Sequence, residues 1–345
     1  MADHALRQGR ALEIGQVGRM LLVTGGAGFI GSNVVAALND SGRSDVVVCD
    51  LLGNDGKWRN LAKRQLVDIV PPAELLDWLQ GRKLDAVIHL GAISSTTATD
   101  GDHVFETNFR MSMRLLDWCT AGAVPFIYAS SAATYGDGET GFDDDASIPA
   151  LKKLRPMNLY GWSKHMFDLA VAGRRTNGDP LPPQCVGLKF FNVFGPNEYH
   201  KGSMMSVLAR RFDDVKTGRV VQLFKSHREG IADGDQRRDF IYVDDVVRVI
   251  MWLLATPSVS GLFNVGTGKA RSFKDLMLAA YAALGTRPNI EYIDMPEQIR
   301  GAYQYFTQSE VDRLCRAGYN GGFTTLENAV KAYVENYLDR SDRFR

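Results

Sequence analysis

A tyrosine, a lysine and a serine in the middle of the chain have the chemistry for proton transfer at an alcohol. The segment "YGWSK" places Tyr160 and Lys164 four residues apart, on one face of a helix. A tyrosine with an ordinary pKa of ~10 is a poor base near neutral pH, but a neighbouring ammonium lowers that pKa. In "YASSAATYG", Ser131 can hydrogen-bond the reacting oxygen, with Ser130 as the weaker candidate. The hypothesis is a catalytic set of Ser131, Tyr160 and Lys164; a surface Tyr–Lys pair is the alternative, because this spacing is common.

A glycine turn near the start of the chain predicts a phosphate-binding site. The segment "VTGGAGFIG" places Gly25, Gly28 and Gly31 at G-x-x-G-x-x-G spacing directly after an apolar run. Glycine lets backbone N–H groups at the start of the next helix approach a pyrophosphate. An acid, Asp50, ends the next apolar run, "DVVVCD", which favours dinucleotide binding over a plain turn. Lys164 could then also hold the nicotinamide ribose.

The residues around Asp50 leave the choice of dinucleotide open. Asp50 is placed to hydrogen-bond a ribose 2′-hydroxyl, which favours NAD. Lys57 and Arg59 follow closely and could instead hold a 2′-phosphate, which favours NADP. From these residues alone, neither cofactor is preferred.

The elements that must position these residues alternate between strand and helix. Strands buried on both faces, as in a parallel sheet, are predicted by the continuous apolar runs "MLLVTGG", "DVVVCD", "DAVIHLGA", "PFIYASS" and "CVGLKFFN". Helices are predicted at 30–38, 105–119 and 160–173, and the stretch 270–345 is predicted to be mostly helical, with a strand at "IEYIDMP". We therefore expect an α/β fold, a Rossmann-type doubly wound parallel sheet with a smaller C-terminal α/β substrate domain. The predicted parts are a flexible tail (1–18), a dinucleotide-binding domain (19–190, with the chain returning near 238–268) and a substrate-binding domain (191–237 and 269–345).

The composition narrows the class of protein. The chain has 345 residues, of which 45% are hydrophobic and 23% charged, and its formal net charge is +0, which argues against a general nucleic-acid or membrane-surface binder. No apolar run approaches the ~20 residues that span a bilayer, and the first residues lack the apolar segment of a secretory signal. The cysteines, Cys49, Cys119, Cys185 and Cys315, form no C-x-x-C pair. We expect a cytoplasmic protein in a reducing compartment, without a disulfide framework or a metal site.

Longer segments resemble one enzyme superfamily. The glycine turn, the serine and Y-x-x-x-K are similar to the extended short-chain dehydrogenase/reductases, which mostly modify nucleotide-activated sugars, and "FNVFGP", "RRDFIYVDDV" and "FNVGTG" extend this resemblance along most of the chain. More specifically, "GFIGSNVVAALND", "GAISSTT", "FNVFGPNEYHKGSM" and "YQYFTQSE" resemble the ADP-glycero-manno-heptose 6-epimerase family. The resemblance implies inversion of C6 of ADP-D-glycero-D-manno-heptose by transient oxidation to a ketone, for lipopolysaccharide core. It also implies a homo-oligomer with one tightly bound cofactor in each subunit and no nucleic-acid or membrane partner.

The resemblance implies a role for Lys201, in "FNVFGPNEYHKGS". A carbinol that is inverted presents its O–H in two directions, and proton transfer requires hydrogen-bond reach, so one fixed base serves only one geometry well. The resemblance therefore implies two acid/base groups, Tyr160 and Lys201. A solvated or diphosphate-contacting lysine is the alternative. A catalytic Lys201 needs a pKa lowered by burial or by nearby cations, for which His200 and Lys164 are candidates.

The resemblance also implies which residues contact the cofactor and the substrate. Cofactor contacts are implied for Gly25, Gly28, Phe29, Ile30, Gly31, Asp50, Leu51, Lys57, Leu90, Gly91, Ala92, Ile93, Ser94, Asn108, Tyr160, Lys164, Val193 and Lys201. Substrate contacts are implied for Ser95, Ser131, Asn192, Ser203, Arg210, Phe224, Arg238 and Tyr303. Arg237 is a close rival to Arg238 for the substrate diphosphate, and His89 is expected to pack at a strand end without a catalytic role.

Three features depart from the family pattern. Leu51 stands where a polar residue usually follows the strand-end acid, Thr107 precedes Asn108 where two asparagines are expected, and the loop "KSHREGIADGDQRRD" is longer than usual. The family generally prefers NADP, and Lys57 lies in the right region for its phosphate. NADP is therefore expected, with NAD as the alternative.

Three other functions share parts of the pattern. A nucleotide-sugar 4,6-dehydratase needs an acid pair after the threonine that follows the catalytic serine, but Tyr135 follows Thr134 here. A UDP-hexose 4-epimerase fits the core motifs but does not need Lys201. A regulator that senses dinucleotide without turnover usually lacks the tyrosine or the lysine, and Tyr160 and Lys164 are both present.

Overall fold

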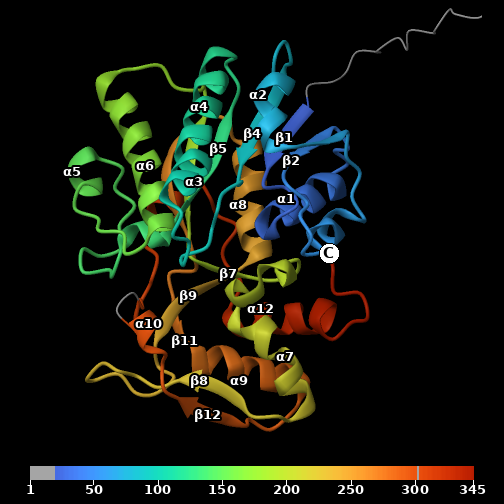
Figure 1. The fold of residues 1–345 in the computed structure, drawn as a ribbon, viewed down its shortest axis with the longest axis vertical. Helices are drawn as coiled ribbons and strands as arrows, with labels where there is room; N and C mark the ends of the chain where they lie inside the picture. The colour runs from blue at the N-terminus through green and yellow to red at the C-terminus, as the bar shows by residue number, and fades with distance from the viewer. Residues whose placement is uncertain (1–19, 301–302) are drawn as a thin grey trace, which may run out of the picture.

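The main sheet consists of parallel strands that bring the predicted site residues to one edge. In spatial order the seven strands are β10 (Gly261–Val265), β6 (Cys185–Phe190), β5 (Phe126–Ser131), β4 (Leu84–His89), β1 (Met20–Thr24), β2 (Val46–Cys49) and β3 (Asp68–Val70) (Figure 1). The computed structural model describes residues 20–300 and 303–345, so the tail predicted at 1–18 lies outside the described residues. The strand order reverses between β1 and β4, where a ligand crevice opens beyond the carboxyl ends in such sheets. The predicted doubly wound parallel sheet is confirmed.

Helices cover both faces of this sheet, which explains the continuous apolar runs. One face carries α1 (Phe29–Asp40) and α8 (Val243–Ala255), and the other carries α2 (Leu75–Trp78), α4 (Met111–Ala121) and α6 (Leu159–Asn177). In β1, Leu21 and Val23 pack toward α1 and α8, whereas Met20 and Leu22 pack toward the opposite helices. Each strand therefore needs an apolar side chain at nearly every position.

A smaller part of the chain packs at the carboxyl edge of the main sheet, at the bottom of Figure 1. Its elements are a three-stranded sheet of β11 (Ala270–Ser272), β9 (Arg237–Tyr242) and β7 (Asn192–Phe194), a two-stranded sheet of β12 (Ile290–Ile293) and β8 (Val221–Phe224), and helices α7 (Val207–Thr217), α9 (Phe273–Leu284) and α12 (Leu326–Tyr333). These helices share a hydrophobic core of their own. The chain returns from this part to the main sheet through α8 and β10, and the predicted domain limits stay a prediction.

One helix prediction needs correction: the stretch 270–345 is only partly helical because 303–311 runs without helix. The predicted helix at 105–119 is confirmed, with a π-helical turn at 106–110. The predicted helices at 30–38 and 160–173 lie within α1 and α6. The remaining short elements are η1 (Lys57–Leu61), η2 (Pro72–Glu74), α3 (Gly101–Phe105), η3 (Glu106–Arg110), η4 (Ala132–Tyr135), α5 (Ile148–Leu151), η5 (Tyr199–Met204), α10 (Glu297–Arg300), α11 (Asp312–Arg316) and η6 (Val334–Leu338).

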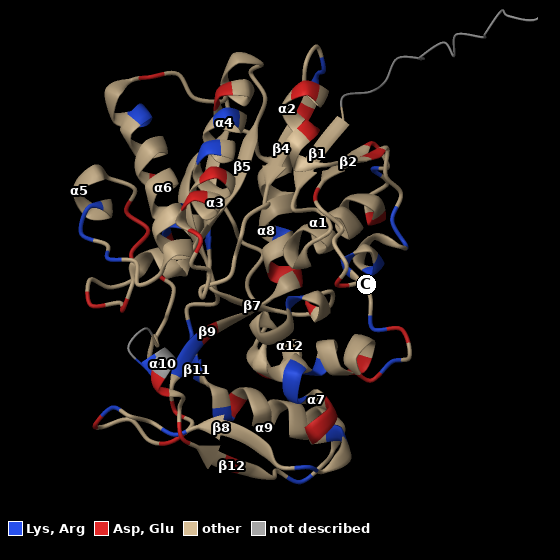
Figure 2. Ribbon diagram, in the orientation of Figure 1, with Lys and Arg blue, Asp and Glu red and all other residues tan. Residues whose placement is uncertain are grey.

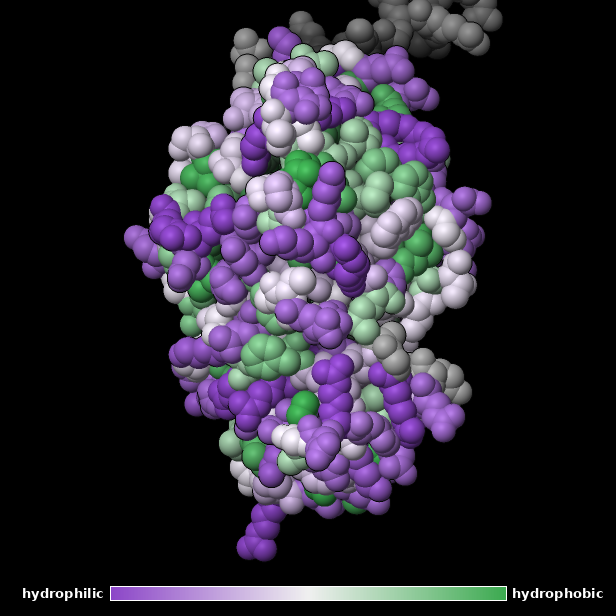
Figure 3. Space-filling view, turned by 90° about the vertical axis from the view of Figure 1, so that its left-hand side faces the viewer, coloured by the Kyte–Doolittle hydropathy of each residue, from purple (hydrophilic) through white to green (hydrophobic). Residues whose placement is uncertain are grey.

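The surface mixes charged and apolar residues. Figure 2 shows acidic and basic residues interspersed along the helices and loops of both parts, in keeping with the formal net charge of +0. On the face drawn in Figure 3, hydrophobic residues form separate patches between hydrophilic ones. None of the described helices combines the length and the apolar character that crossing a membrane would require.

The turn after β1 packs directly against the start of α1. Gly25 has a φ of +67°, in the left-handed region, and a Cβ there would lie 2.7 Å from the backbone nitrogen of Gly91. At Gly31, in the first turn of α1, a Cβ would overlap the carbonyl oxygen of Gly25. Only glycine allows this approach of helix, turn and strand end.

Replacing Gly31 with alanine tests this packing. The new methyl group would meet backbone that cannot rotate away, so we expect a loss of roughly 1–3 kcal/mol in the free energy of unfolding, measured in urea. Gly173→Ala in α6 is a matched control, because a Cβ there meets nothing within 4 Å. It should be neutral or stabilising by roughly 0.5–1 kcal/mol. Equal losses in both variants would contradict the packing explanation.

Candidate active site

The start of α1 presents backbone N–H groups at the strand-order reversal. Gly28 is the N-cap residue of α1, and in the described part of the chain no side chain caps this end. The first-turn N–H groups of a helix attract anions, so this end suits a pyrophosphate. The glycines at positions 25 and 31 keep side chains out of the same space. The geometry therefore fits the dinucleotide phosphates predicted from the glycine spacing.

The acid at the end of β2 is fixed by three contacts. The Asp50 carboxylate accepts hydrogen bonds from the backbone nitrogens of Ala27 at 2.9 Å and Leu51 at 2.8 Å. Lys57, the first residue of η1, donates its Nζ to the same carboxylate at 2.8 Å. The Leu51 side chain is 64% exposed beside it. Asp50 and Lys57 thus form one unit at the place where the adenosine ribose of a dinucleotide would lie, and together they fit such a group.

Asn108 fixes the loop that follows β4. Its side chain is fully buried, accepts from the Ile93 nitrogen at 2.8 Å, and donates to the Ile93 oxygen at 3.0 Å and to Ser163 Oγ at 2.9 Å. These bonds tie the loop containing Leu90, Gly91, Ala92, Ile93, Ser94 and Ser95 to the start of α6. Within this loop Ser94 is exposed and Ser95 bonds Thr97 at 3.0 Å. The structure thus places Asn108 below the loop, where it positions residues predicted to contact the cofactor.

Ser131 and Tyr160 meet where β5 ends and α6 begins. Ser131 caps η4 by accepting from the Ala133 nitrogen at 3.1 Å, and its side chain lies near enough to the Tyr160 hydroxyl to lower the pKa of that group. Ser130, the weaker candidate, instead donates to Asp168 at 2.7 Å and is buried. The arrangement favours Ser131 over Ser130 as the partner of Tyr160.

The prediction that Lys164 lowers the pKa of Tyr160 is wrong for this structure. Burial raises the pKa of the Tyr160 hydroxyl, the hydrogen bond with Ser131 opposes that rise, and the Asp168 carboxylate adds to it. Lys164 is itself buried, and burial lowers the pKa of its ammonium to about 8, with Asp168 acting in the opposite direction. Burial thus shifts the pKa of the Tyr160 hydroxyl in the direction opposite to the predicted one.

A buried ion pair below this site was missed from the sequence. Lys189 of β6 lies 3.1 Å from Asp168, which is one helical turn after Lys164 in α6. Lys189 also donates to Thr134 Oγ1 at 2.5 Å, and Thr134 donates to the backbone oxygen of Ser131 at 2.8 Å. A lysine inside the apolar run "CVGLKFFN" is the signal that could have revealed it, because a charge in a buried strand needs a partner. The pair connects the end of β5 with α6.

Lys201 lies against the first residue of α1. Its Nζ is 5.2 Å from the ring centroid of Phe29, and the side chain is half-buried in η5. Burial lowers the pKa of the Lys201 ammonium, and the carboxylate of the buried Glu198 opposes this. Burial therefore lowers the Lys201 pKa, an effect for which the nearby cations His200 and Lys164 were also candidates. Among the described residues no hydrogen bond, ion pair or ring contact joins Lys201 to Tyr160.

An aromatic and cationic group in the smaller part gathers several predicted substrate residues. Arg238 is buried, with its guanidinium carbon 5.0 Å from the ring centroid of Tyr303, and Phe224 lies edge-on to Tyr303 with centroids 6.4 Å apart. Burial raises the pKa of the Tyr303 hydroxyl, and the positive charges of Arg238 and Arg210 oppose this rise. Arg237, the rival to Arg238, is exposed and pairs with Asp235. The structure favours Arg238.

The remaining predicted residues lie on β7, on η5 and at the end of β4. In β7, Asn192 is exposed and accepts from Thr307 at a long 3.4 Å, while Val193 is half-buried. Ser203 is exposed in η5. His89 bonds Thr24 at 2.7 Å and Ser112 at 2.8 Å, and burial lowers the pKa of its imidazole to about 3. The predicted packing position of His89 at a strand end is confirmed.

The chain is similar to known proteins of one enzyme family. The model of the NAD dependent epimerase/dehydratase family matches residues 21–266. The chain is 48% identical over 330 residues to the ADP-L-glycero-D-manno-heptose-6-epimerase of Nitratidesulfovibrio vulgaris, which covers 94% of this chain and 100% of that protein. A crystal structure of the Helicobacter pylori ADP-L-glycero-D-manno-heptose-6-epimerase superposes with a TM-score of 0.76 at 27% identity, covering 92% of this chain and 96% of that one. The Thermus thermophilus UDP-glucose 4-epimerase in complex with NAD gives 0.72 at 25% identity, covering 93% and 99%.

The match with the family model spans the glycine turn, Asp50 and the Ser131–Tyr160–Lys164 set as well as the return of the chain to the main sheet. The alignment with the Nitratidesulfovibrio vulgaris protein covers 94% of this chain, and so it also includes most of the smaller part. The resemblance inferred from sequence is thereby confirmed, and the chain belongs to the NAD dependent epimerase/dehydratase family.

Proposed function

We propose that the protein is an ADP-L-glycero-D-manno-heptose 6-epimerase that inverts C6 of ADP-D-glycero-D-manno-heptose, in the supply of heptose for lipopolysaccharide core. The relative with this name shares 48% identity across 94% of the chain. The observation that carries the proposal is the half-buried Lys201 beside Phe29, in a loop distinct from the strand and helix that hold Ser131 and Tyr160. Two separately anchored acid/base groups are what inversion of a carbinol requires.

The cofactor is a nicotinamide dinucleotide, which when bound supplies a hydride acceptor that also returns the hydride. We propose NADP, one per subunit and tightly held, with NAD as the alternative. Support comes from Lys57, which brings a positive charge 2.8 Å from the Asp50 carboxylate that would otherwise repel a 2′-phosphate. The start of α1 would receive the pyrophosphate, and the buried ammonium of Lys164 would hold the nicotinamide ribose.

The proposed proton transfers fall to Tyr160 and Lys201. As the hydride leaves C6, one of the two groups would accept the proton of the C6 hydroxyl. As the hydride returns to the opposite face of C6, the other group would donate a proton to the C6 oxygen. Ser131, which lies beside the Tyr160 hydroxyl, would hold the reacting oxygen through a hydrogen bond. A lowered pKa brings the Lys201 amine closer to neutral pH, where proton transfer by a general base is most effective.

The substrate would extend from this centre toward the smaller part. We propose that the buried Arg238, with its fork of donors, receives the diphosphate, and that Tyr303 and Phe224 pack on the sugar and the nucleotide. Ser95, Asn192, Ser203 and Arg210 complete the proposed contacts. We further propose a cytoplasmic homo-oligomer; all four cysteines are unpaired in the structure, which agrees with a reducing compartment.

Turnover of ADP-D-glycero-D-manno-heptose tests the function. Incubation without added oxidant or reductant should convert it into a mixture with the L-glycero epimer, because the hydride is returned in each cycle. The configuration at C6 is read by NMR. Inversion of C4 in a UDP-hexose, with no change in the ADP-heptose, would identify a UDP-hexose 4-epimerase instead. Cofactor fluorescence without turnover of any sugar nucleotide would favour a dinucleotide-sensing regulator.

Two substitutions test the proposed bases. Tyr160→Phe and Lys201→Met each remove one proton carrier, so kcat should fall by about 10²–10⁴-fold while cofactor fluorescence shows unchanged binding. Lys331→Met is a control, because that side chain is 62% exposed on α12 and, among the described residues, forms an ion pair only with Glu335 four positions later. A near-normal kcat in Lys201→Met would rule out its catalytic role.

The buried ammonium of Lys164 should make stability depend on pH. Burial lowers its pKa to about 8 in the folded protein, whereas an unfolded chain has ~10.4. Between these values the unfolded chain binds a proton that the folded one has released, so the free energy of unfolding rises with pH relative to Lys164→Met. The quantity to measure is the free energy of unfolding of the parent protein minus that of Lys164→Met, obtained from urea unfolding at about pH 7.5 and about pH 9.5. It should increase by on the order of 2 kcal/mol between these two pH values. A difference independent of pH would mean that Lys164 is not buried as a charge.

A further inference from the structure

The loop before Lys201 is held on one side by α1 and η1. Asn33 donates to the Pro196 oxygen at 3.0 Å, Asn197 donates to Ser32 Oγ at 3.0 Å, and Asn60 donates to the Asn197 oxygen at 3.1 Å. Asn197 is fully buried and has a φ of +72°, a left-handed conformation that asparagine adopts more readily than most residues, and both its backbone oxygen and its side chain are hydrogen-bonded. The conformation of this loop therefore depends on the partners of Asn197.

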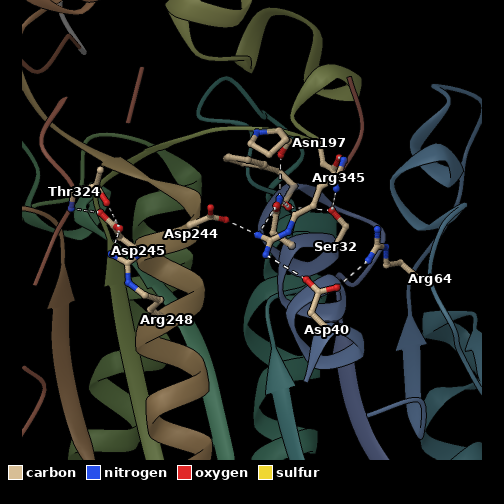
Figure 4. A network of polar contacts seen from close by, with 12 residues as sticks. Ser32, Asp40, Arg64, Asn197, Asp244, Asp245, Arg248, Thr324 and Arg345 are labelled. Atoms are coloured by element: carbon tan, nitrogen blue, oxygen red, sulfur yellow. Dashed lines mark hydrogen bonds and ion pairs between the residues drawn. The ribbon is translucent and has the colours of Figure 1, made fainter. Parts of the chain in front are cut away.

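The last residues of the chain hold the same loop from the other side. The backbone nitrogen of Arg345 donates to Asn197 Oδ1 at 3.0 Å (Figure 4). Its guanidinium bonds Asp244 at the start of α8, bonds Asn33 Oδ1 at 3.4 Å and lies 3.7 Å from Asp40 at the end of α1. One arginine thus connects α1, α8 and the loop, with its charge between two carboxylates.

Two further contacts reach the loop two residues before Lys201. The Tyr199 hydroxyl donates to the backbone oxygen of Arg343 at 2.8 Å, and its ring meets Phe344 edge-on with centroids 5.3 Å apart. Lys63 donates to the Phe344 oxygen at 2.6 Å and so anchors the same segment to the main domain. Residues 343–345 therefore contact both ends of the stretch from Asn197 to Tyr199.

We propose that residues 343–345 are a positioning element for Lys201, with Arg345 as its positioning residue. The inference rests on the proposed function, in which Lys201 is an acid/base group. Arg345 anchors the segment to α1, the helix whose first residue, Phe29, lies under the Lys201 ammonium. Arg345 therefore bonds the loop through its backbone nitrogen and α1 through its guanidinium, in addition to the direct bonds between the loop and α1.

The surroundings of Arg345 make it possible to distinguish a positioning effect from a loss of fold by mutation. Its side chain is 19% exposed and borders a solvent-open cavity of about 570 Å³ between α1 and α8. Water can therefore reach Asp40 and Asp244 when the guanidinium is removed. Arg340 offers a matched control in the same segment: it is exposed, and within 20–300 and 303–345 its Nε donates only to the Glu335 oxygen.

The first test compares Arg345→Ala, Arg345→Lys and Arg340→Ala as holoenzymes. Arg345→Ala should lower kcat for ADP-heptose by about 10–100-fold with KM nearly unchanged, because a displacement of about 1 Å at an acid/base group has an effect of this size. The pH at which Lys201 loses its proton should rise, because a freed side chain is less buried. Arg345→Lys should restore part of kcat, since an ammonium can pair with a carboxylate but lacks the fork. Arg340→Ala should match the parent protein.

Amide hydrogen exchange, read by mass spectrometry on the same holoenzymes, gives a second readout. Arg345→Ala should speed exchange in the peptide covering 197–205 and leave α9 unchanged, because a local opening exposes only the loop. A global loss of fold would instead speed exchange in α9 as well and would overturn the proposal unless Arg345→Lys, which keeps a charge, shows the local effect.

Three results would contradict the proposal in distinguishable ways. If Arg345→Ala matches Arg340→Ala in kcat and in exchange, the segment does not hold the loop. If exchange rises but kcat and its pH profile do not change, the segment anchors the loop without positioning Lys201. If Lys201→Met keeps full turnover, the proposed function is wrong in its choice of base, and the role of Arg345 in catalysis fails with it.

Discussion

The contact of the turn after β1 with the start of α1 is the constraint on which the rest of the site depends. Gly25 and Gly31 have no room for a Cβ, so the helix begins directly at the strand-order reversal of the sheet. The same helix carries Phe29 below Lys201, and its Ser32 and Asn33 hold the loop before that lysine. A displacement of α1 would therefore move the phosphate-binding backbone and the proposed second base together.

Burial sets the electrostatics of both lysines, and one carboxylate moderates each. Burial lowers the pKa of the Lys164 ammonium, and the Asp168 carboxylate opposes this. Burial also lowers the pKa of the Lys201 ammonium, and the Glu198 carboxylate opposes that shift. Asp168 is also paired with Lys189 at 3.1 Å, so the charge below the Ser131–Tyr160 pair is balanced inside the protein. An unpaired charge at that depth would carry a large desolvation penalty, which explains why a complete pair is buried there.

Local patterns in the sequence predicted most of the fold and the positions of the short-range motifs. The apolar runs identified the strands of the main sheet, because both faces of that sheet are covered. Ser131, Tyr160 and Lys164 were predicted from type and spacing, and the structure brings the first two together. The direction of the Tyr160 pKa was not predictable, since it depends on how deeply the whole fold buries the hydroxyl. The contacts of Arg345 with Asn197 and of Lys189 with Asp168 join distant parts of the chain, and neither follows from local periodicity.

A crystal structure of the protein with nicotinamide cofactor and ADP-heptose would test the central proposal most directly. Two acid/base groups that serve opposite faces of one carbon should place the Tyr160 hydroxyl and the Lys201 Nζ each within hydrogen-bond reach, about 3 Å, of positions that the C6 oxygen can occupy. A Lys201 Nζ more than about twice that distance away and directed into bulk water would contradict the proposal, whatever the position of Tyr160.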